Sequence, residues 1–84
     1  MNGSKIGTVS HYYDKIKVAI LNLTSDLKVG DTIKFVRGGE ELFSQNVDSI
    51  QVEHKSIDTA GSGDVVGLKV ENDVKEGAEV FKVE

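Results

Sequence analysis

The sequence predicts an all-β protein, a small closed antiparallel β-barrel of about six strands. Twelve valines and six isoleucines occur in 84 residues, and β-branched side chains suit pleated, half-buried strands. Apolar residues alternate in short runs that glycine and aspartate turns separate, which is typical of sheets. Closure of the sheet suits a chain this small because it removes exposed strand edges.

The first two expected strands are Lys5 to Ser10 and Lys15 to Leu21. In the second run, Ile16, Val18 and Ile20 alternate with polar or small residues, which favours a strand. A helical spacing of apolar residues also fits this segment, but the alternation is tighter and a glycine ends the segment soon after. We therefore expect strands at both places.

The remaining strands are separated by turn-forming residues. Thr32 to Arg37 is the third strand, and Gly38-Gly39 forms a hairpin turn because glycine readily adopts a positive φ. Leu42 to Val52 is a long fourth strand whose alternation slips by one residue, which predicts a β-bulge. Val66 to Val70 and Val80 to Val83 complete the set.

The chain is expected to hold one domain. Residues 1–4 are interpreted as a disordered end or the remnant of a cloning tag, and residues 5–84 as a single β-barrel domain. The longest apolar run, Val18 to Leu21, is far shorter than the roughly 18 residues of a membrane span. No signal peptide is visible, so we expect a cytoplasmic protein without a membrane partner.

The charge is acidic overall and uneven along the chain. Ten Lys and Arg face fourteen Asp and Glu, giving a net charge of −4. Residues 1–39 hold six bases against three acids, and residues 40–84 hold four against eleven. The plainer interpretation is a solvated surface of mixed sign, and a local basic face is the alternative.

The residues that usually carry catalysis or bind metals are sparse. The chain has no cysteine, and its two histidines, His11 and His54, lie far apart in the sequence. The stretch from Gly61 to Asp64 is interpreted as a plain turn, because a phosphate loop needs a following lysine and a helix. We therefore expect no enzyme, no catalytic residue, no metal site and no cofactor.

Aromatic residues beside bases are the best candidates for binding a partner. Two tyrosines precede two lysines, a combination typical of stacking surfaces for single-stranded RNA and of protein hot spots. The alternative is a turn whose tyrosines cap the end of the barrel. The candidate RNA- or partner-binding residues are Tyr12, Tyr13, Lys15, Lys17, Arg37, His54 and Lys55.

Five segments in order resemble a known family. They are Ile6 to Val9, Leu27 to Ile33, Val47 to His54, Ala60 to Leu68 and Val74 to Lys82. Their order and spacing resemble the second domain of translational GTPases, the elongation factor Tu family, especially its archaeal and eukaryotic branch. The resemblance extends from Lys5 to Val83.

This resemblance implies a closed barrel of Greek-key type and a role in translation. In the family, the barrel contacts the small ribosomal subunit, the GTPase domain and, in some members, the aminoacyl end of transfer RNA. His54 and Lys55 match the strand that supplies family contacts. No P-loop lysine motif occurs, so the chain alone is not expected to bind GTP.

Two functions follow as hypotheses. The first is a non-catalytic, stand-alone translation factor-like module that binds ribosomal RNA, transfer RNA or a translation-associated protein. The second is an accessory module that docks on an enzyme or another protein, which the net acidity and the small size support. The resemblance alone does not determine the function, because the same barrel also occurs as an accessory domain, for example as the tail of collagenase-like peptidases. The oligomeric state is left open.

Overall fold

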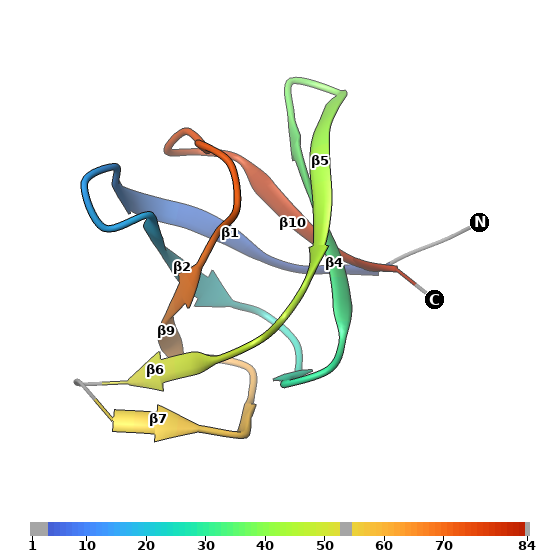
Figure 1. The fold of residues 1–84 in the computed structure, drawn as a ribbon. Coiled ribbons are helices and arrows are strands. Elements are labelled where there is room, and N and C mark those ends of the chain that lie inside the picture. Colours follow the sequence, from blue (N-terminus) through green and yellow to red (C-terminus); the bar gives the residue numbers. More distant parts are fainter. Residues whose placement is uncertain (1–3, 53–54, 84) are drawn as a thin grey trace.

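The structure is a computed structural model that describes residues 4–52 and 55–83 (Figure 1). All regular elements in these ranges are β-strands, which confirms the all-β prediction. The strands are β1 (Ser4–Tyr13), β2 (Val18–Leu23), β3 (Leu27–Lys28), β4 (Thr32–Arg37), β5 (Glu40–Asn46), β6 (Ile50–Val52), β7 (Lys55–Ile57), β8 (Thr59–Ala60), β9 (Val65–Lys69) and β10 (Glu79–Val83). In these ranges, no helix is long and apolar enough to cross a membrane.

Eight of the strands form one strongly curled sheet (Figure 1). Their order is β5-β4-β10-β1-β2-β9-β6-β7, and β3 pairs with β8 in a separate two-stranded sheet. Neighbouring strands in both sheets run antiparallel, as expected. Residues 1–4 were predicted to be a disordered end. Ser4 is instead the first residue of β1, and residues 1–3 lie outside the described residues.

The predicted closed barrel is not found. Within the described residues, β5 and β7 stand at the two ends of the large sheet and do not pair with each other. The reason lies where the expected fourth strand breaks, between Asn46 and Ile50. There the Val47 N–H donates to the Asp31 carbonyl at 2.8 Å, and the Val47 carbonyl accepts from the Gly30 N–H at 2.9 Å. These backbone groups therefore bond to a turn instead of extending the sheet.

The side chain of Gln45 bridges part of the gap between β5 and the end of β9. Its Nε2 donates to the Lys69 carbonyl at 2.9 Å, and its Oε1 accepts from the Glu71 N–H at 2.9 Å. A neighbouring parallel strand would bond the same two backbone groups on either side of Val70. Gln45 is only 7% exposed, so its amide replaces backbone hydrogen bonds that water cannot easily supply.

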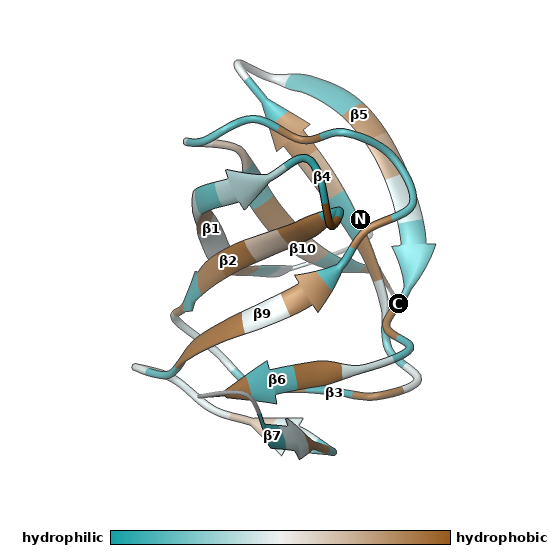
Figure 2. Ribbon diagram, turned by 60° about the vertical axis from the view of Figure 1, so that its left-hand side comes forward, coloured by the Kyte–Doolittle hydropathy of each residue, from teal (hydrophilic) through white to brown (hydrophobic). Residues whose placement is uncertain are grey.

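The inner face of the curled sheet holds a continuous apolar core. Alternation directs every second side chain of a strand inward, and in β2 these are Ala19, Leu21 and Leu23. Phe35 of β4 is fully buried, and its ring lies 4.9 Å from that of Phe43. Figure 2 shows that β2 and β9 consist mostly of hydrophobic residues.

Three expected strands differ clearly in extent from those observed. β1 continues through Tyr13, so the tyrosines belong to a strand and not to a turn. The following residues 14–17 form a turn in which Lys17 has a φ of 55°, so β2 begins three residues later than predicted. The long strand Leu42 to Val52 is divided into β5 and β6. The slipped alternation between Val47 and Ile50 therefore marks a break in the strand. A register shift does occur in β5, but at Leu42, where Phe35 pairs with Phe43 and Val36 with Glu41.

The predicted hairpin turn at Gly38-Gly39 is confirmed. Arg37 pairs with Glu40, and the two glycines between them have φ values of 62° and 83°. Two consecutive positive φ values are the geometry of a type I′ turn, whose twist matches that of antiparallel strands.

Loss of the Gln45 bridge should destabilise the fold. In Gln45→Leu, the Lys69 carbonyl and the Glu71 N–H lose their partner, and we expect the free energy of unfolding to fall by about 2–4 kcal/mol. Urea unfolding measures this, with Gln51→Leu as the matched control because Gln51 is exposed. Equal stability of the two variants would contradict the role assigned to the bridge.

Gln45→Glu tests the donor separately. An ionised carboxylate cannot donate to the Lys69 carbonyl, whereas the protonated acid can. The folded-state pKa of the introduced acid should therefore lie above its unfolded value, and its stabilising contribution should be lost as the pH rises. We expect the deficit relative to the parent protein to be smaller at pH 4.5 than at pH 7, as measured by urea unfolding at both values.

Two glycines should respond oppositely to alanine. A Cβ at Gly7 would lie 2.6 Å from the Asn22 carbonyl oxygen, whereas at Gly67 its nearest neighbour would be Val18 Cγ1 at 3.4 Å. Gly7→Ala should cost about 1–3 kcal/mol through steric strain. Gly67→Ala should be neutral or stabilise by up to about 1 kcal/mol. Thermal or urea unfolding of both variants checks this, and a stable Gly7→Ala would contradict the close approach.

Candidate functional site

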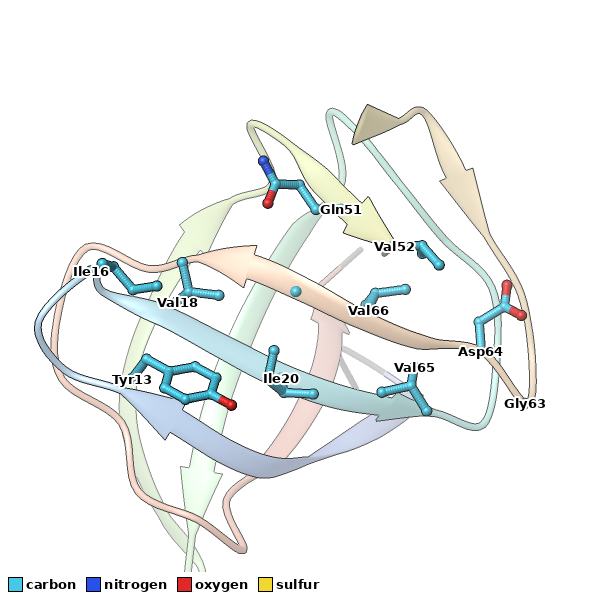
Figure 3. A pocket seen from close by; sticks show the side chains of 11 residues that line it. Tyr13, Ile16, Val18, Ile20, Gln51, Val52, Gly63, Asp64, Val65 and Val66 are labelled. Atoms are coloured by element: carbon cyan, nitrogen blue, oxygen red, sulfur yellow. The ribbon is translucent and has the colours of Figure 1, made fainter. Parts of the chain in front are cut away.

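An apolar groove of about 740 Å³ lies on the outer face of β2, β9 and β6 (Figure 3). The strand alternation that directs Ala19 and Leu21 inward directs Val18 and Ile20 outward into the groove. On β9, Gly67 pairs with Ile20 on one side and with Gln51 on the other. Because Gly67 has no side chain, the middle of the outer face is hollow.

The rim of the groove carries large exposed apolar side chains. Tyr13 is 48% exposed, Ile16 61% and Val65 53%, and all three line the groove. Among the described residues, the other exposed large hydrophobic side chains are Val29 and Leu42. Apolar side chains gathered around a hollow typically mark a protein interaction site or a ligand site.

The two ends of the groove differ in charge. Asp64 lines it at one end, opposite Ile16 and Tyr13 in Figure 3. Lys69 does not itself line the groove, but it pairs with the lining residue Val18 and, by the alternation of β9, faces outward beyond the other end. Neither Asp64 nor Lys69 forms an ion pair with another described residue.

A second hollow, of about 440 Å³, lies elsewhere on the surface and is lined mainly by residues with ionisable side chains, so we call it the polar hollow. It brings Tyr12 and Arg37 together with Glu40, Asp73 and Lys75. The Tyr12 hydroxyl donates to Asp73 Oδ1 at 2.8 Å, and the Lys17 ammonium lies 3.4 Å from the same oxygen. Asp73 therefore ties the loop before β10 to the end of β1 and the turn after it.

This contact shifts the pKa of both partners. Burial raises the pKa of Tyr12 to about 12, and the hydrogen bond to Asp73 and the nearby negative charges add to the shift. The hydrogen bond from Tyr12 lowers the pKa of Asp73, and Lys17 lowers it further. At neutral pH the tyrosine is therefore protonated and the carboxyl ionised.

The structure does not gather the predicted binding residues at one place. Tyr12, Arg37 and Lys17 lie around the polar hollow, and Tyr13 lines the apolar groove. Lys15 is exposed in the turn after β1, and Lys55 is exposed at the start of β7, opposite Val52. His54 lies outside the described residues.

The bases of the first half do not form a purely basic face. Lys5 lies 3.0 Å from Glu79, Lys17 3.4 Å from Asp73 and Lys34 3.9 Å from Glu41. The pairing of β1 with β10 brings Lys5 close to Glu79, the β4–β5 hairpin brings Lys34 close to Glu41, and the loop before β10 places Asp73 beside Lys17. The charge bias along the sequence is thus partly neutralised across the surface.

Sequence reasoning missed Asp73 and the groove around Gly67. Asp73 is 61 residues from Tyr12, so no local pattern relates them. A signal for the groove was present, since Val65 and Gly67 share one face of the β9 alternation. A glycine in the middle of a strand can mark close approach of another molecule.

The described residues contain no group of three or more His, Asp or Glu side chains arranged to hold a metal ion. In the same ranges, every buried side-chain nitrogen or oxygen has a hydrogen-bond partner. The chemistry offered by the two hollows is therefore that of apolar contact in one and of ionised side chains and a tyrosine in the other.

Comparison with known proteins relates the chain to peptidases. It is 38% identical over 77 residues to an uncharacterized protease of Methanocaldococcus jannaschii. The match covers 92% of this chain but 19% of the relative, so the chain spans about a fifth of that protein's length. No family model matches the chain.

Two solved structures share the fold. One is the C-terminal domain of a Geobacillus thermoleovorans protein named as a U32 peptidase, with a TM-score of 0.86, 22% identity, and coverage of 93% of this chain and 90% of that domain. The other is the selenomethionine variant of the same domain, with a TM-score of 0.85, 22% identity, and coverage of 92% and 96%.

These findings correct the resemblance to the second domain of translational GTPases. The relatives are named as proteases and peptidases, not as elongation factors. The translation factor-like function inferred from that resemblance was therefore wrong. The misleading signal was an ordered set of glycine turns and apolar alternation, which describes how a small sheet folds more than what it binds.

Removal of the Tyr12 hydroxyl should release the pKa of Asp73. In Tyr12→Phe the carboxylate loses its largest stabilising contact, so we expect the pKa of Asp73 to rise toward its ordinary value. NMR titration of the Asp73 side-chain carboxyl measures this, with Tyr13→Phe as the matched control. An unchanged Asp73 pKa in Tyr12→Phe would contradict the contact.

The same contact predicts a pH window for stability. The lowered pKa of Asp73 gives a contribution that is lost as the pH falls through that value, and the raised pKa of Tyr12 gives one that is lost as the pH rises toward about 12. The stability difference between the parent and Tyr12→Phe should therefore be largest at neutral pH, as urea unfolding across this range can measure.

Proposed function

We propose that this chain is a non-catalytic accessory module that docks on a peptidase. The observation that carries the proposal is the match to about a fifth of a longer protease along 92% of this chain. The shared fold with the C-terminal domain of a second peptidase supports it, because that domain likewise has its place in a larger enzyme.

The chemistry of the two hollows supports a role in binding. The apolar groove holds one ionisable carboxylate, Asp64, and one tyrosine, Tyr13. In the polar hollow, the pKa of Tyr12 is raised further above neutral pH and the pKa of Asp73 is lowered further below it. A general acid or base works best when its pKa lies near the operating pH, so this pair is poorly suited to proton transfer.

The groove is suited to docking because a rigid sheet supports it. Its floor strands, β2 and β9, pair over five residues from Val18–Lys69 to Asn22–Val65. Their opposite faces pack into the core, where Leu21 and Leu68 are fully buried. A preorganised apolar surface loses little conformational entropy when a partner binds.

A chimaera tests the proposal. In the M. jannaschii protease, this chain would replace the 77 matching residues. Docking should slow amide hydrogen exchange in parts of the module relative to the isolated chain, because bound surfaces open less often. Hydrogen-exchange mass spectrometry measures both proteins under the same conditions. Equal exchange throughout the module would overturn the proposal, as would hydrolysis of unfolded casein by the isolated chain.

A further inference from the structure

We infer that the apolar groove over Gly67 is the docking face and that its occupant is a short apolar segment of the peptidase, with an acidic residue at one end and a basic residue at the other. This inference rests on the proposed function and adds to it the face and the chemistry of the partner. It is argued from the shape of the groove, its exposed apolar rim and the charges at its ends.

The shape of the groove requires a protruding partner. Gly67 lies between its two cross-strand partners, Ile20 of β2 and Gln51 of β6. Because it has no side chain, the sheet surface is recessed there. A Cβ placed on Gly67 would lie 3.4 Å from Val18 Cγ1 and 3.6 Å from Ile20 Cδ1. The side chains of Val18 and Ile20 therefore border Gly67 closely, and an apolar side chain of a partner would rest on them above the glycine. Two copies of a recessed face do not fill each other, which disfavours a second copy of this chain.

The rim adds apolar area around the recess. Tyr13, Ile16 and Val65 are about half exposed or more, and each borders the groove. Tyr13 is held by an edge-to-face contact with His11, with ring centroids 4.5 Å apart. An aromatic ring fixed in this way is a typical hot-spot anchor, since little side-chain freedom is lost on binding.

The charges at the two ends define the direction of the partner. Asp64 directly precedes β9 and Lys69 is its last residue, so five residue steps of about 3.3 Å separate them by about 16 Å where the chain is extended. A complementary segment has its acidic residue over Lys69, its basic residue over Asp64 and apolar residues between them. Such end charges orient a partner, while the apolar contacts between them supply affinity.

The first experiment uses a peptide probe on the intact chain. The probe is acetyl-Asp-Leu-Phe-Leu-Thr-Lys-amide, and its controls carry serine at the three apolar positions or Asn and Gln at the ends. Titration of the ¹⁵N-labelled chain should shift amide resonances of β2 and β9 with the probe and more weakly with either control. Shifts confined to other strands, or equal shifts with the serine control, would overturn the inference.

Variants of the chain identify the face. Gly67→Leu fills the recess and should weaken probe binding at least about tenfold. Lys69→Glu reverses one end charge and should weaken it less, by about two- to fivefold. Lys75→Glu is the matched control because it makes the same charge change at the polar hollow, and it should bind as the parent does. Val65→Ser removes an apolar side chain from the rim and adds no bulk. It tests probe binding even if Gly67→Leu does not fold. Unchanged binding in Val65→Ser and Lys69→Glu would overturn the inference.

The same variants in the chimaera distinguish two questions: whether the module docks on the peptidase, and whether it docks through the groove. If docking slows exchange in the parent chimaera and Val65→Ser or Lys69→Glu abolishes the slowing, the groove is the docking face. If the slowing persists in both variants, the docking function stands and the groove is wrong. If the parent chimaera shows no slowing, the docking function fails and the inference fails with it, whether or not the peptide binds. Sedimentation of the parent chain as a dimer that Val65→Ser dissociates would instead identify a second copy as the occupant.

Discussion

The Gln45 amide holds together a sheet that backbone pairing leaves open. β5 is an end strand of the large sheet, and its neighbour across the gap is the stretch from Lys69 to Glu71. One side-chain amide supplies both the donor and the acceptor that this stretch needs, at 2.9 Å each. Buried backbone groups without partners are costly, so this single residue allows the sheet to curl tightly around its core. The break after β5 becomes tolerable because Gly30 and Asp31 bond the backbone of Val47.

The position of the groove follows from this curled sheet. A tightly curled sheet encloses its inner side chains and spreads its outer ones, so the outer face of β2 and β9 opens around any residue that lacks a side chain. Gly67 is that residue, and its partners Ile20 and Gln51 stand on either side of it. The end of β9 bonded by Gln45 is also the end that carries Lys69. The Gln45 hydrogen bonds therefore also hold the end of β9, the strand that forms the floor of the groove.

The local sequence pattern was sufficient to predict most strands and turns, but it was insufficient to predict whether the sheet closes into a barrel. Alternation and glycine pairs predicted an all-β chain, and Gly38-Gly39 forms the expected hairpin because turn chemistry is a property of adjacent residues. Gln45 could not be recognised in this way, since a glutamine in a strand is normally exposed and its partners are 24 and 26 residues away. The placement of Tyr12 and Tyr13 at different sites was also missed, because both tyrosines were assigned to one candidate surface. Adjacent strand residues point to opposite faces, so one contacts Asp73 and the other lines the groove.

The energetics favour apolar docking over attraction by net charge. The ion pairs of Lys5 and Lys17 join exposed side chains, and Lys34 is half-buried beside an exposed Glu41. Exposed pairs contribute about 0–1 kcal/mol each. Salt screens exposed charges that lie more than about 8–10 Å apart, which weakens long-range attraction of a partner by net charge. Apolar surface removed from water contributes about 25 cal/mol per Å², so a groove rimmed by Tyr13, Ile16 and Val65 has the larger source of affinity. The charges of Asp64 and Lys69 then act mainly on orientation, because a reversed partner would place like charges together at both ends.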